Sequence, residues 1–335
     1  MKEVRRMVIY TRSLPALIRD LADTPAMRRL QKVGMYCGCE YTLLPVYRKA
    51  AVPRNRLEHS LGAAEIVWHF THDIRQSAAA LLHDIAVPCF AHTVDFLRGD
   101  ALRQEATEAG TANMIAASAE IGELLHRAGI AVKDVSDYHR YPIADNPLPA
   151  LSADRLEYLL GDAERLLGYT GGQAIYDDIL TGQNAAGTQE MCFAHIEKAR
   201  EFGFVALRVA RLYASPEDRY AMQELADLLR FALDIGAICE ADLHETEPAL
   251  IARLTACPDT ALRWRRFCAL RGVRVSAAPK EGEPCVRIAV KRRAVDPLVQ
   301  MDGQAVRLSE ADAEYCRAYR SFLDEGQDGR ISGVR

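Results

Sequence analysis

The feature that most constrains the fold of this chain is a helical repeat of apolar residues over most of its length. From about residue 13 to 235, apolar residues recur three and four positions apart, the spacing that places them on one face of an α-helix. Prolines at 45, 53, 88, 142–149 and 216 interrupt the repeat and divide it into several helices. We therefore predict a mainly α protein with a helical domain over residues 1–240.

The C-terminal part, residues 241–335, has a different pattern. Apolar and basic residues alternate in VRIAVKR at 286–292, which is typical of a half-buried strand. Residues 308–323 then read as a capped final helix. The basic run VKRRAV at 290–295, together with Arg287, is interpreted as a solvated strand edge, with a nucleotide or phosphate contact at a subunit interface as the alternative. This part is predicted to be a small α+β appendage.

Composition limits the partners more than the fold. The 335 residues carry a formal net charge of −4, so a small molecule is a better expectation than nucleic acid. The nine cysteines have no paired zinc-site spacing and are expected to be reduced thiols. The apolar runs are too short to be membrane spans. We expect a cytoplasmic protein without a membrane partner.

A His-Asp pair ends the alanine-rich segment AALLHDIAVPCFAH at residues 79–92. Asp84 follows an apolar run, and a buried aspartate needs a cation, a metal or several hydrogen-bond donors as compensation. Upstream, His59 shares a helical stripe with Ile66 and is expected to point toward the core. The imidazoles of His59 and His83 and the carboxylate of Asp84 therefore predict a polar site inside the helical domain.

A third segment adds more polar groups to one helix face. Asp154, Tyr158 and Asp162 in DRLEYLLGD are each four positions apart. The four candidate metal ligands are then His59, His83, Asp84 and Asp154. Nitrogen and oxygen ligands without sulfur suit a divalent first-row metal, which lowers the pKa of a bound water and polarises a phosphate ester beside it. The alternative is a set of hydrogen-bonded core histidines with aspartate caps.

Four segments together resemble a known family. They are LADTPAMRRLQKVG, NRLEHSLG, LLHDIAVPCFAHTVD and DRLEYLLGD, within residues 20–170. They resemble the HD-domain metal-dependent phosphohydrolases, and most closely the deoxynucleoside triphosphate triphosphohydrolase branch that includes the sterile-alpha-motif/HD enzyme. The resemblance implies an HD-type helical core, one divalent ion (Mn, Fe, Ni, Co, Zn or Mg), a nucleotide or related phosphate ester as substrate, and homo-oligomeric assembly.

The resemblance also implies roles for individual residues. The metal ligands are the same four residues that the helical patterns suggest. The other site residues would be Arg56 and Arg155 at the substrate phosphates, Tyr158 and Asp162 at its sugar, and His92 and Asp95 for proton handling and water positioning near the metal.

The sequence differs from the triphosphohydrolase branch at several positions that would face the catalytic cleft. Gln104 and Glu105 stand in place of a His-Glu pair at the cleft, and a glutamine can bind substrate but cannot protonate a leaving oxygen. The other departures are Ala86 and Val87 after the His-Asp pair, and Met222 and Glu224 in place of a tyrosine and a histidine. Gln104 favours a regulatory module that binds metal or nucleotide without turnover, whereas His92 and Asp95 favour an enzyme. Within the enzyme class, a phosphomonoesterase or phosphodiesterase is the alternative to a triphosphohydrolase.

Overall fold

The structure is a computed structural model that describes residues 8–49, 54–102, 110–277, 285–327 and 329–335. Over these residues the chain is mainly helical with two small sheets, which confirms the predicted fold class. Gln104 and Glu105 lie outside the described residues.

Three helices carry the candidate site, and each begins at a side-chain cap. They are α4 (Arg56–Thr71), α5 (Ile74–Leu82) and α9 (Ala153–Leu167). Asn55, Asp73 and Ser152 accept hydrogen bonds from backbone N–H groups of the first turns, which fixes where the helices start. Because α4 contacts both α5 and α9, residues near the ends of these helices are brought together.

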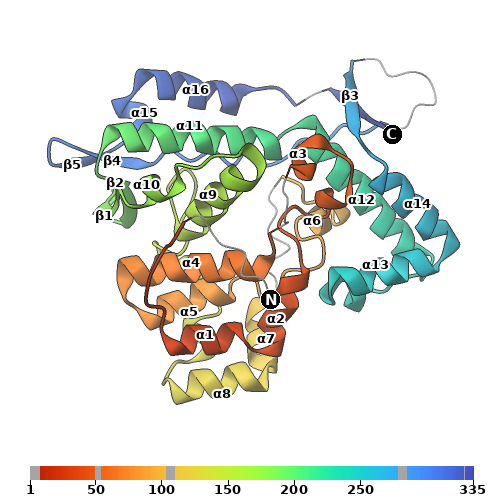
Figure 1. The fold of residues 1–335 in the computed structure, drawn as a ribbon, viewed down its shortest axis with the longest axis horizontal. Coiled ribbons are helices and arrows are strands. Elements are labelled where there is room, and N and C mark those ends of the chain that lie inside the picture. The colour runs from red at the N-terminus through yellow and green to blue at the C-terminus, as the bar shows by residue number, and fades with distance from the viewer. Residues whose placement is uncertain (1–7, 50–53, 103–109, 278–284, 328) are drawn as a thin grey trace.

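Short helices from the N-terminal half surround this group. They are α1 (Ala16–Ala22), α2 (Pro25–Arg28), η1 (Arg29–Lys32), η2 (Cys39–Tyr41), α3 (Pro45–Arg48), α6 (Thr93–Leu97), α7 (Thr111–Ala117), α8 (Ala119–Arg127), η3 (Val132–Asp134) and η4 (Tyr138–Arg140). In Figure 1, α5, α1 and α8 lie on the opposite side of α4 from α9. The polar ends of α4, α5 and α9 therefore lie in the interior of the fold.

A second group of helices follows α9. They are α10 (Gly172–Tyr176), α11 (Ile196–Tyr213), α12 (Pro216–Asp234), η5 (Glu240–His244), α13 (Glu247–Ala256), α14 (Pro258–Cys268), α15 (Leu308–Ala311) and α16 (Ala313–Asp324). α11 contacts both α9 and α16, and α12 contacts α6 and α14. Figure 1 shows α16 lying alongside α11 at the top of the view, so the final helix covers α11.

Two sheets join distant parts of the chain. The larger sheet has the order β1-β2-β4-β5, from β1 (Ile179–Gln183), β2 (Gln189–Phe193), β4 (Leu298–Met301) and β5 (Gln304–Arg307). β2 pairs with β4 in parallel, with Cys192 opposite Leu298, and the other two pairings are antiparallel. β3 (Gly272–Ser276) and β6 (Arg330–Val334) form an antiparallel pair. The β2–β4 pairing crosses the predicted domain boundary at residue 240, which itself stays a prediction.

The strand predicted at 286–292 is wrong. Val286 makes one isolated bridge to Ile331, and the chain continues to residue 297 without regular secondary structure. Side chains take the place of a neighbouring strand: Arg219 Nη1 donates to the Ile288 carbonyl at 2.7 Å, and the Gln327 side chain accepts from the Val290 N–H at 2.8 Å. Alternation of apolar and basic residues predicts a strand, but strand pairing depends on partners that alternation does not reveal.

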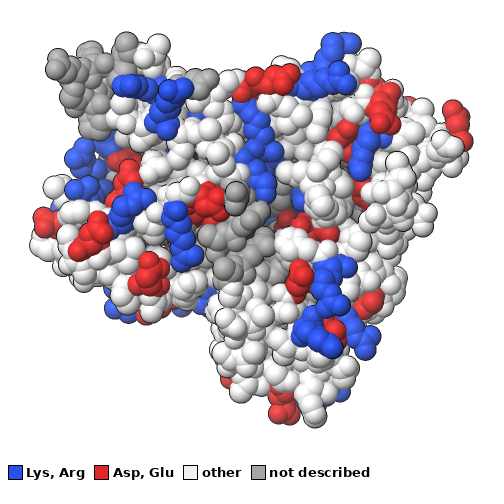
Figure 2. Space-filling view, turned by 180° about the vertical axis from the view of Figure 1, so that it is seen from behind, with Lys and Arg blue, Asp and Glu red and all other residues white. Residues whose placement is uncertain are grey.

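Within the described residues, none of the helices combines the length and the apolar character needed to cross a membrane. Figure 2 shows basic and acidic side chains mixed over the face opposite to that of Figure 1. All nine cysteines carry free thiols, in agreement with the sequence prediction.

Candidate metal centre

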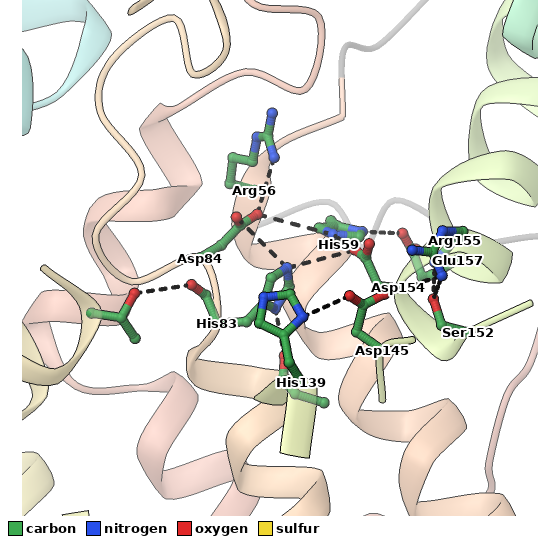
Figure 3. A network of polar contacts seen from close by, with 12 residues as sticks. Arg56, His59, His83, Asp84, His139, Asp145, Ser152, Asp154, Arg155 and Glu157 are labelled. Atoms are coloured by element: carbon green, nitrogen blue, oxygen red, sulfur yellow. Dashed lines mark hydrogen bonds and ion pairs between the residues drawn. The ribbon is translucent and has the colours of Figure 1, made fainter. Parts of the chain in front are cut away.

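The four predicted metal ligands come from three places in the helical core. His59 lies in the first turn of α4 and is 2% exposed, while His83 and Asp84 follow the last residue of α5. Asp154 lies in the first turn of α9. Figure 3 shows their side chains converging from these elements.

Distances confirm that the four side chains meet. His59 Nε2 lies 3.0 Å from Asp154 Oδ1, and His83 Nε2 lies 3.7 Å from the same oxygen. Asp84 places Oδ1 3.6 Å from His83 Nε2 and Oδ2 4.0 Å from His59 Nε2. One ligand atom from each of His59, His83 and Asp154 falls within 4.8 Å of the others, so a single ion could contact all of them.

The outer nitrogens of both imidazoles have partners that orient the rings. His59 Nδ1 lies 2.6 Å from Glu157 Oε2, and His83 Nδ1 lies 2.7 Å from the Ala80 carbonyl oxygen. Each Nδ1 therefore donates a proton outward, so Nε2 is the nitrogen of each ring that faces the centre and would bind a cation. A histidine that ligates a metal is held in this way, by a carboxylate or a carbonyl on its other nitrogen. The donor set fits a divalent cation.

Electrostatics at the centre also favours a positive charge. Burial would raise the pKa of Asp84, but His83 and Arg56 outweigh it and lower that pKa to about 2. Burial likewise opposes ionisation of Asp154, while His59 keeps its pKa below the usual range. Burial would lower the pKa of His59, but Asp154 and Glu157 raise it to about 10. Two ionised carboxylates thus face the point where the Nε2 atoms meet.

Behind His59 lies a buried ion-pair network that the sequence analysis missed. Arg54 Nη2 lies 2.5 and 2.6 Å from the two Glu157 oxygens, and Nη1 lies 3.0 Å from Asp162 Oδ1. Two helix-interior glycines make room for it. A Cβ on Gly62 would come within 2.6 Å of the Glu157 side chain, and a Cβ on Gly161 within 2.1 Å of Arg54 Nη1. Glycine inside a helix is unfavourable, so these two positions are the signal in the sequence that points to the network.

The centre opens into a cavity of about 470 Å³. Of the other predicted site residues, Arg56, His92, Arg155, Tyr158 and Asp162 line it. Asp95 is fully buried behind His92. The structure therefore brings the described members of the predicted site around one space.

The two arginines predicted at the substrate phosphates both contact protein groups. Arg56 Nη1 lies 3.1 Å from Asp84 Oδ2. Arg155 Nη1 lies 3.2 Å from Asp145 Oδ1 and donates to Asn146 Oδ1 at 2.8 Å. Figure 3 shows Arg56 beside Asp84 and Arg155 on the far side of Asp154. Their predicted role at phosphate oxygens stays a prediction.

His92 and Asp95 form a hydrogen-bonded pair at the cavity. His92 Nδ1 donates to Asp95 Oδ2 at 2.8 Å, and Arg293 Nη2 lies 3.4 Å from His92 Nε2. Burial lowers the pKa of His92, and the positive charges of Arg293 and Arg56 lower it further. The hydrogen bond to Asp95 raises this pKa but does not outweigh them. These effects favour the neutral form of His92, with the Nδ1 proton held by Asp95 and with Nε2 facing the Arg293 guanidinium at the cavity wall.

The residues predicted at the sugar have different surroundings. Tyr158 lines the cavity and its ring centroid lies 6.1 Å from that of Tyr213. Asp162 accepts hydrogen bonds from Arg54 and the Tyr213 hydroxyl, so its carboxylate is already engaged by the protein. Met222 lines the cavity, whereas Glu224 is ion-paired with Arg335.

Known proteins share sequence with this chain over different lengths. The chain is 26% identical to the Bacillus subtilis protein YdhJ over 258 residues, which is 76% of this chain and 75% of that protein. It is 30% identical over 152 residues to the metal-dependent phosphohydrolase cns2 of Cordyceps militaris, which is 45% of this chain and 41% of that protein. No protein-family model matches the chain.

Solved structures share the fold over nearly the whole chain. A phosphohydrolase from Bacteroides thetaiotaomicron superimposes with a TM-score of 0.63 at 15% identity, covering 98% of this chain and 97% of that one. A hypothetical protein from Aquifex aeolicus superimposes with a TM-score of 0.65 at 16% identity, covering 96% and 93%. The described architecture, including its C-terminal part, is therefore one that occurs in other proteins.

Proposed function

We propose that this chain is an HD-type metal-dependent phosphohydrolase whose substrate is a nucleotide or a related phosphate ester, with deoxynucleoside triphosphates as the first class to examine. The observation that carries the proposal is the convergence of His59, His83, Asp84 and Asp154 on one point of a cavity. The phosphohydrolase names of cns2 and of the Bacteroides protein support it. The resemblance of the four sequence segments supports the nucleotide substrate.

The bound ion would be one divalent cation of Mn, Fe, Ni, Co, Zn or Mg. When bound, it supplies a Lewis acid and lowers the pKa of a water, which is the chemistry that phosphate-ester hydrolysis needs. His59 and His83 would hold it through Nε2, and Asp84 and Asp154 through carboxylate oxygens. Glu157 fixes the tautomer and the ring orientation of His59.

The cavity walls supply the remaining functions. The guanidinium groups of Arg56 and Arg155 would bind phosphate oxygens, which a planar pair of N–H donors fits well. His92 is neutral and oriented by Asp95, so its Nε2 can accept a proton at the cavity. Proton acceptance by a positioned imidazole typically contributes a hundredfold or more to a rate.

The test combines metal analysis with a product assay. Purified protein should hold about one divalent ion per chain, and a panel of nucleotides and aryl phosphates should release orthophosphate, pyrophosphate or triphosphate. The double variant His83→Ala, Asp84→Ala should lose both the metal and the turnover, because two of four ligands are gone. His126→Ala, an exposed residue of α8, is the matched control and should lose neither. Full metal content in the double variant would refute the assignment.

The same panel separates the subclasses. Triphosphate indicates a triphosphohydrolase, whereas orthophosphate or a cleaved diester indicates the two esterase alternatives. Metal and nucleotide binding without any product would instead support the regulatory module. Cytoplasmic location and homo-oligomeric assembly stay predictions, to be measured by fractionation and by native mass.

A further inference from the structure

The cavity has a second cationic wall that comes from the far end of the sequence. Val290, Lys291 and Arg293 line the same cavity as the metal centre. They belong to the segment without regular secondary structure that replaces the predicted strand. Arg293 Nη2 lies 3.4 Å from His92 Nε2, which places its guanidinium beside the proposed proton acceptor.

This segment is held in place on both sides of the two cations. Before them, Arg219 binds the Ile288 carbonyl and Gln327 binds the Val290 N–H. After them, Ala294 and Val295 are buried, and the Asp296 N–H donates to the Pro149 carbonyl at 2.9 Å. Lys291 and Arg293 are therefore presented by an ordered backbone.

The basic run is divided between two uses. Arg292 Nη1 donates to the Phe322 carbonyl near the end of α16 at 2.7 Å, so this arginine has a structural role. Lys291 and Arg293 both line the cavity, whereas Arg292 is held at the end of α16. Arg287 is exposed at the surface. The solvated edge expected from the sequence describes Arg287 but not Lys291 or Arg293.

We propose that Lys291 and Arg293 form a second anion-binding site in the cavity, which takes an anionic group of the substrate other than the one that is hydrolysed. This inference rests on the proposed function. The substrate class it defines is a molecule with two separated anionic groups, either two phosphates or a phosphate and a carboxylate. One anion lies at the metal centre and the other lies against Lys291 and Arg293.

The chemistry of Lys291 and Arg293 suits binding of a second anionic group. An arginine presents paired N–H donors to a phosphate or carboxylate, and a lysine adds a compact charge that can reach around it. Arg56 is ion-paired with a metal ligand and Arg155 with Asp145, so both lie with the metal-centre group. Lys291 and Arg293 come from a separate element, and a second anion bound there would be fixed at a defined separation from the metal.

The experiment measures binding of non-hydrolysable anions to the metal-loaded protein by calorimetry. The probes are methylphosphonate, bisphosphonates joined by one to four methylene groups, and the matching phosphonocarboxylates. The variants are Lys291→Gln, Arg293→Gln and the double variant, with Arg287→Gln as the matched control for loss of one positive charge on the same segment. Thermal unfolding and metal content are recorded for each protein.

We expect at least one two-anion probe to bind the wild type about tenfold or more tighter than methylphosphonate, since a hydrogen-bonded charge pair contributes that much. The double variant should lose this advantage and keep its affinity for methylphosphonate, its metal and its melting temperature. Arg287→Gln should behave as the wild type. Preference for bisphosphonates over phosphonocarboxylates, or the reverse, identifies the second anion.

Three results would overturn the inference. In the first, the wild type binds one-anion and two-anion probes equally. In the second, the double variant still binds two-anion probes more tightly than methylphosphonate. In the third, the double variant loses affinity for methylphosphonate and for two-anion probes by the same factor. A large fall in melting temperature with unchanged probe binding would also contradict it. If the wild type binds no metal and hydrolyses no ester, the proposed function fails instead. The same probes on chelator-treated protein then test the cationic wall alone.

Discussion

Replacement of Glu157 by glutamine tests the network behind the metal centre. Glu157 is 1% exposed, and its Oε2 accepts hydrogen bonds from both His59 Nδ1 and Arg54 Nη2 at 2.6 Å, while Oε1 accepts from Arg54 Nη2 at 2.5 Å. A glutamine has the same shape but only one oxygen. If that oxygen serves His59, the amide N–H₂ faces the Arg54 guanidinium, and two donors meet where a salt bridge was.

Two effects follow, and their sizes differ. Loss of a charged partner on a ligating histidine costs about 10-fold to 100-fold in metal affinity, since such partners raise the basicity of the ligand. Removing one partner of a buried ion pair costs about 3–5 kcal/mol when the other charge is left alone. Arg54 keeps Asp162 at 3.0 Å, so its charge stays compensated. We therefore expect a loss of about 2–3 kcal/mol, below that range.

Urea unfolding of metal-free protein and calorimetric titration with the metal measure the two effects separately. Glu164→Gln is the matched control, because it makes the same chemical change on the same helix at a residue whose ion pair, within the described part of the chain, is with Arg165 at 3.6 Å. The control should change the free energy of unfolding by less than about 0.5 kcal/mol. Unaltered metal affinity in Glu157→Gln would refute the role of Glu157 in orienting His59.

Three further predictions concern a glycine, a buried acid and the metal. Gly62→Ala should weaken metal binding about tenfold or more, because its Cβ would meet the Glu157 side chain at 2.6 Å. The control Gly122→Ala on α8, where a Cβ would have no contact within 4 Å, should instead add up to about 1 kcal/mol of stability. Metal titration and urea unfolding measure the two effects. Burial raises the pKa of Asp218 to about 7, so the folded protein holds a proton that the unfolded chain releases above pH 4. The free energy of unfolding relative to Asp218→Asn should therefore fall by up to about 4 kcal/mol from pH 4 to 7.5. A difference between the two proteins that does not change with pH would contradict this. Removal of the metal by a chelator should lower the free energy of unfolding by about 2.7 kcal/mol relative to protein at a metal concentration 100 times the Kd, and equal melting curves would contradict it.

The ligands could be predicted from the sequence because each lies in a short, regular context. His59 falls on the apolar stripe of a helix, and His83 and Asp84 end an apolar run, so periodicity alone points them inward. Asp154 lies four positions before Tyr158 on one helix face, and the structure brings these groups to one cavity. Local periodicity indicates which way a side chain points. The inward directions of the three segments that carry the four ligands were enough to suggest that the ligands meet at one site.

The supporting residues could not be predicted in the same way. Arg54 and Glu157 are separated by 103 positions. Arg54 directly precedes the segment NRLEHSLG, and Glu157 lies inside DRLEYLLGD but off the stripe of Asp154, Tyr158 and Asp162. Their contact depends on how α4 and α9 cross, which hydrophobic spacing does not determine. The interior glycines Gly62 and Gly161 are the sequence signal for this contact. At each position a helix contains an unfavourable residue because a Cβ there would clash with the side chain of Glu157 or Arg54.

The positive charges of the cavity show why sequence position alone is a poor guide to role. Arg56 lies three residues before His59 and is ion-paired with Asp84, so a substitution of Arg56 removes a partner of a metal ligand as well as a cation from the proposed phosphate site. Lys291 and Arg293 are more than 130 positions from the ligand on α9 and line the same cavity, where Arg293 Nη2 lies 3.4 Å from His92 Nε2. A loss of substrate binding caused by Arg56 should therefore be accompanied by a change in metal affinity, because one guanidinium serves both. A loss caused by Lys291 should leave the metal in place, and this difference separates the two kinds of cation by measurement.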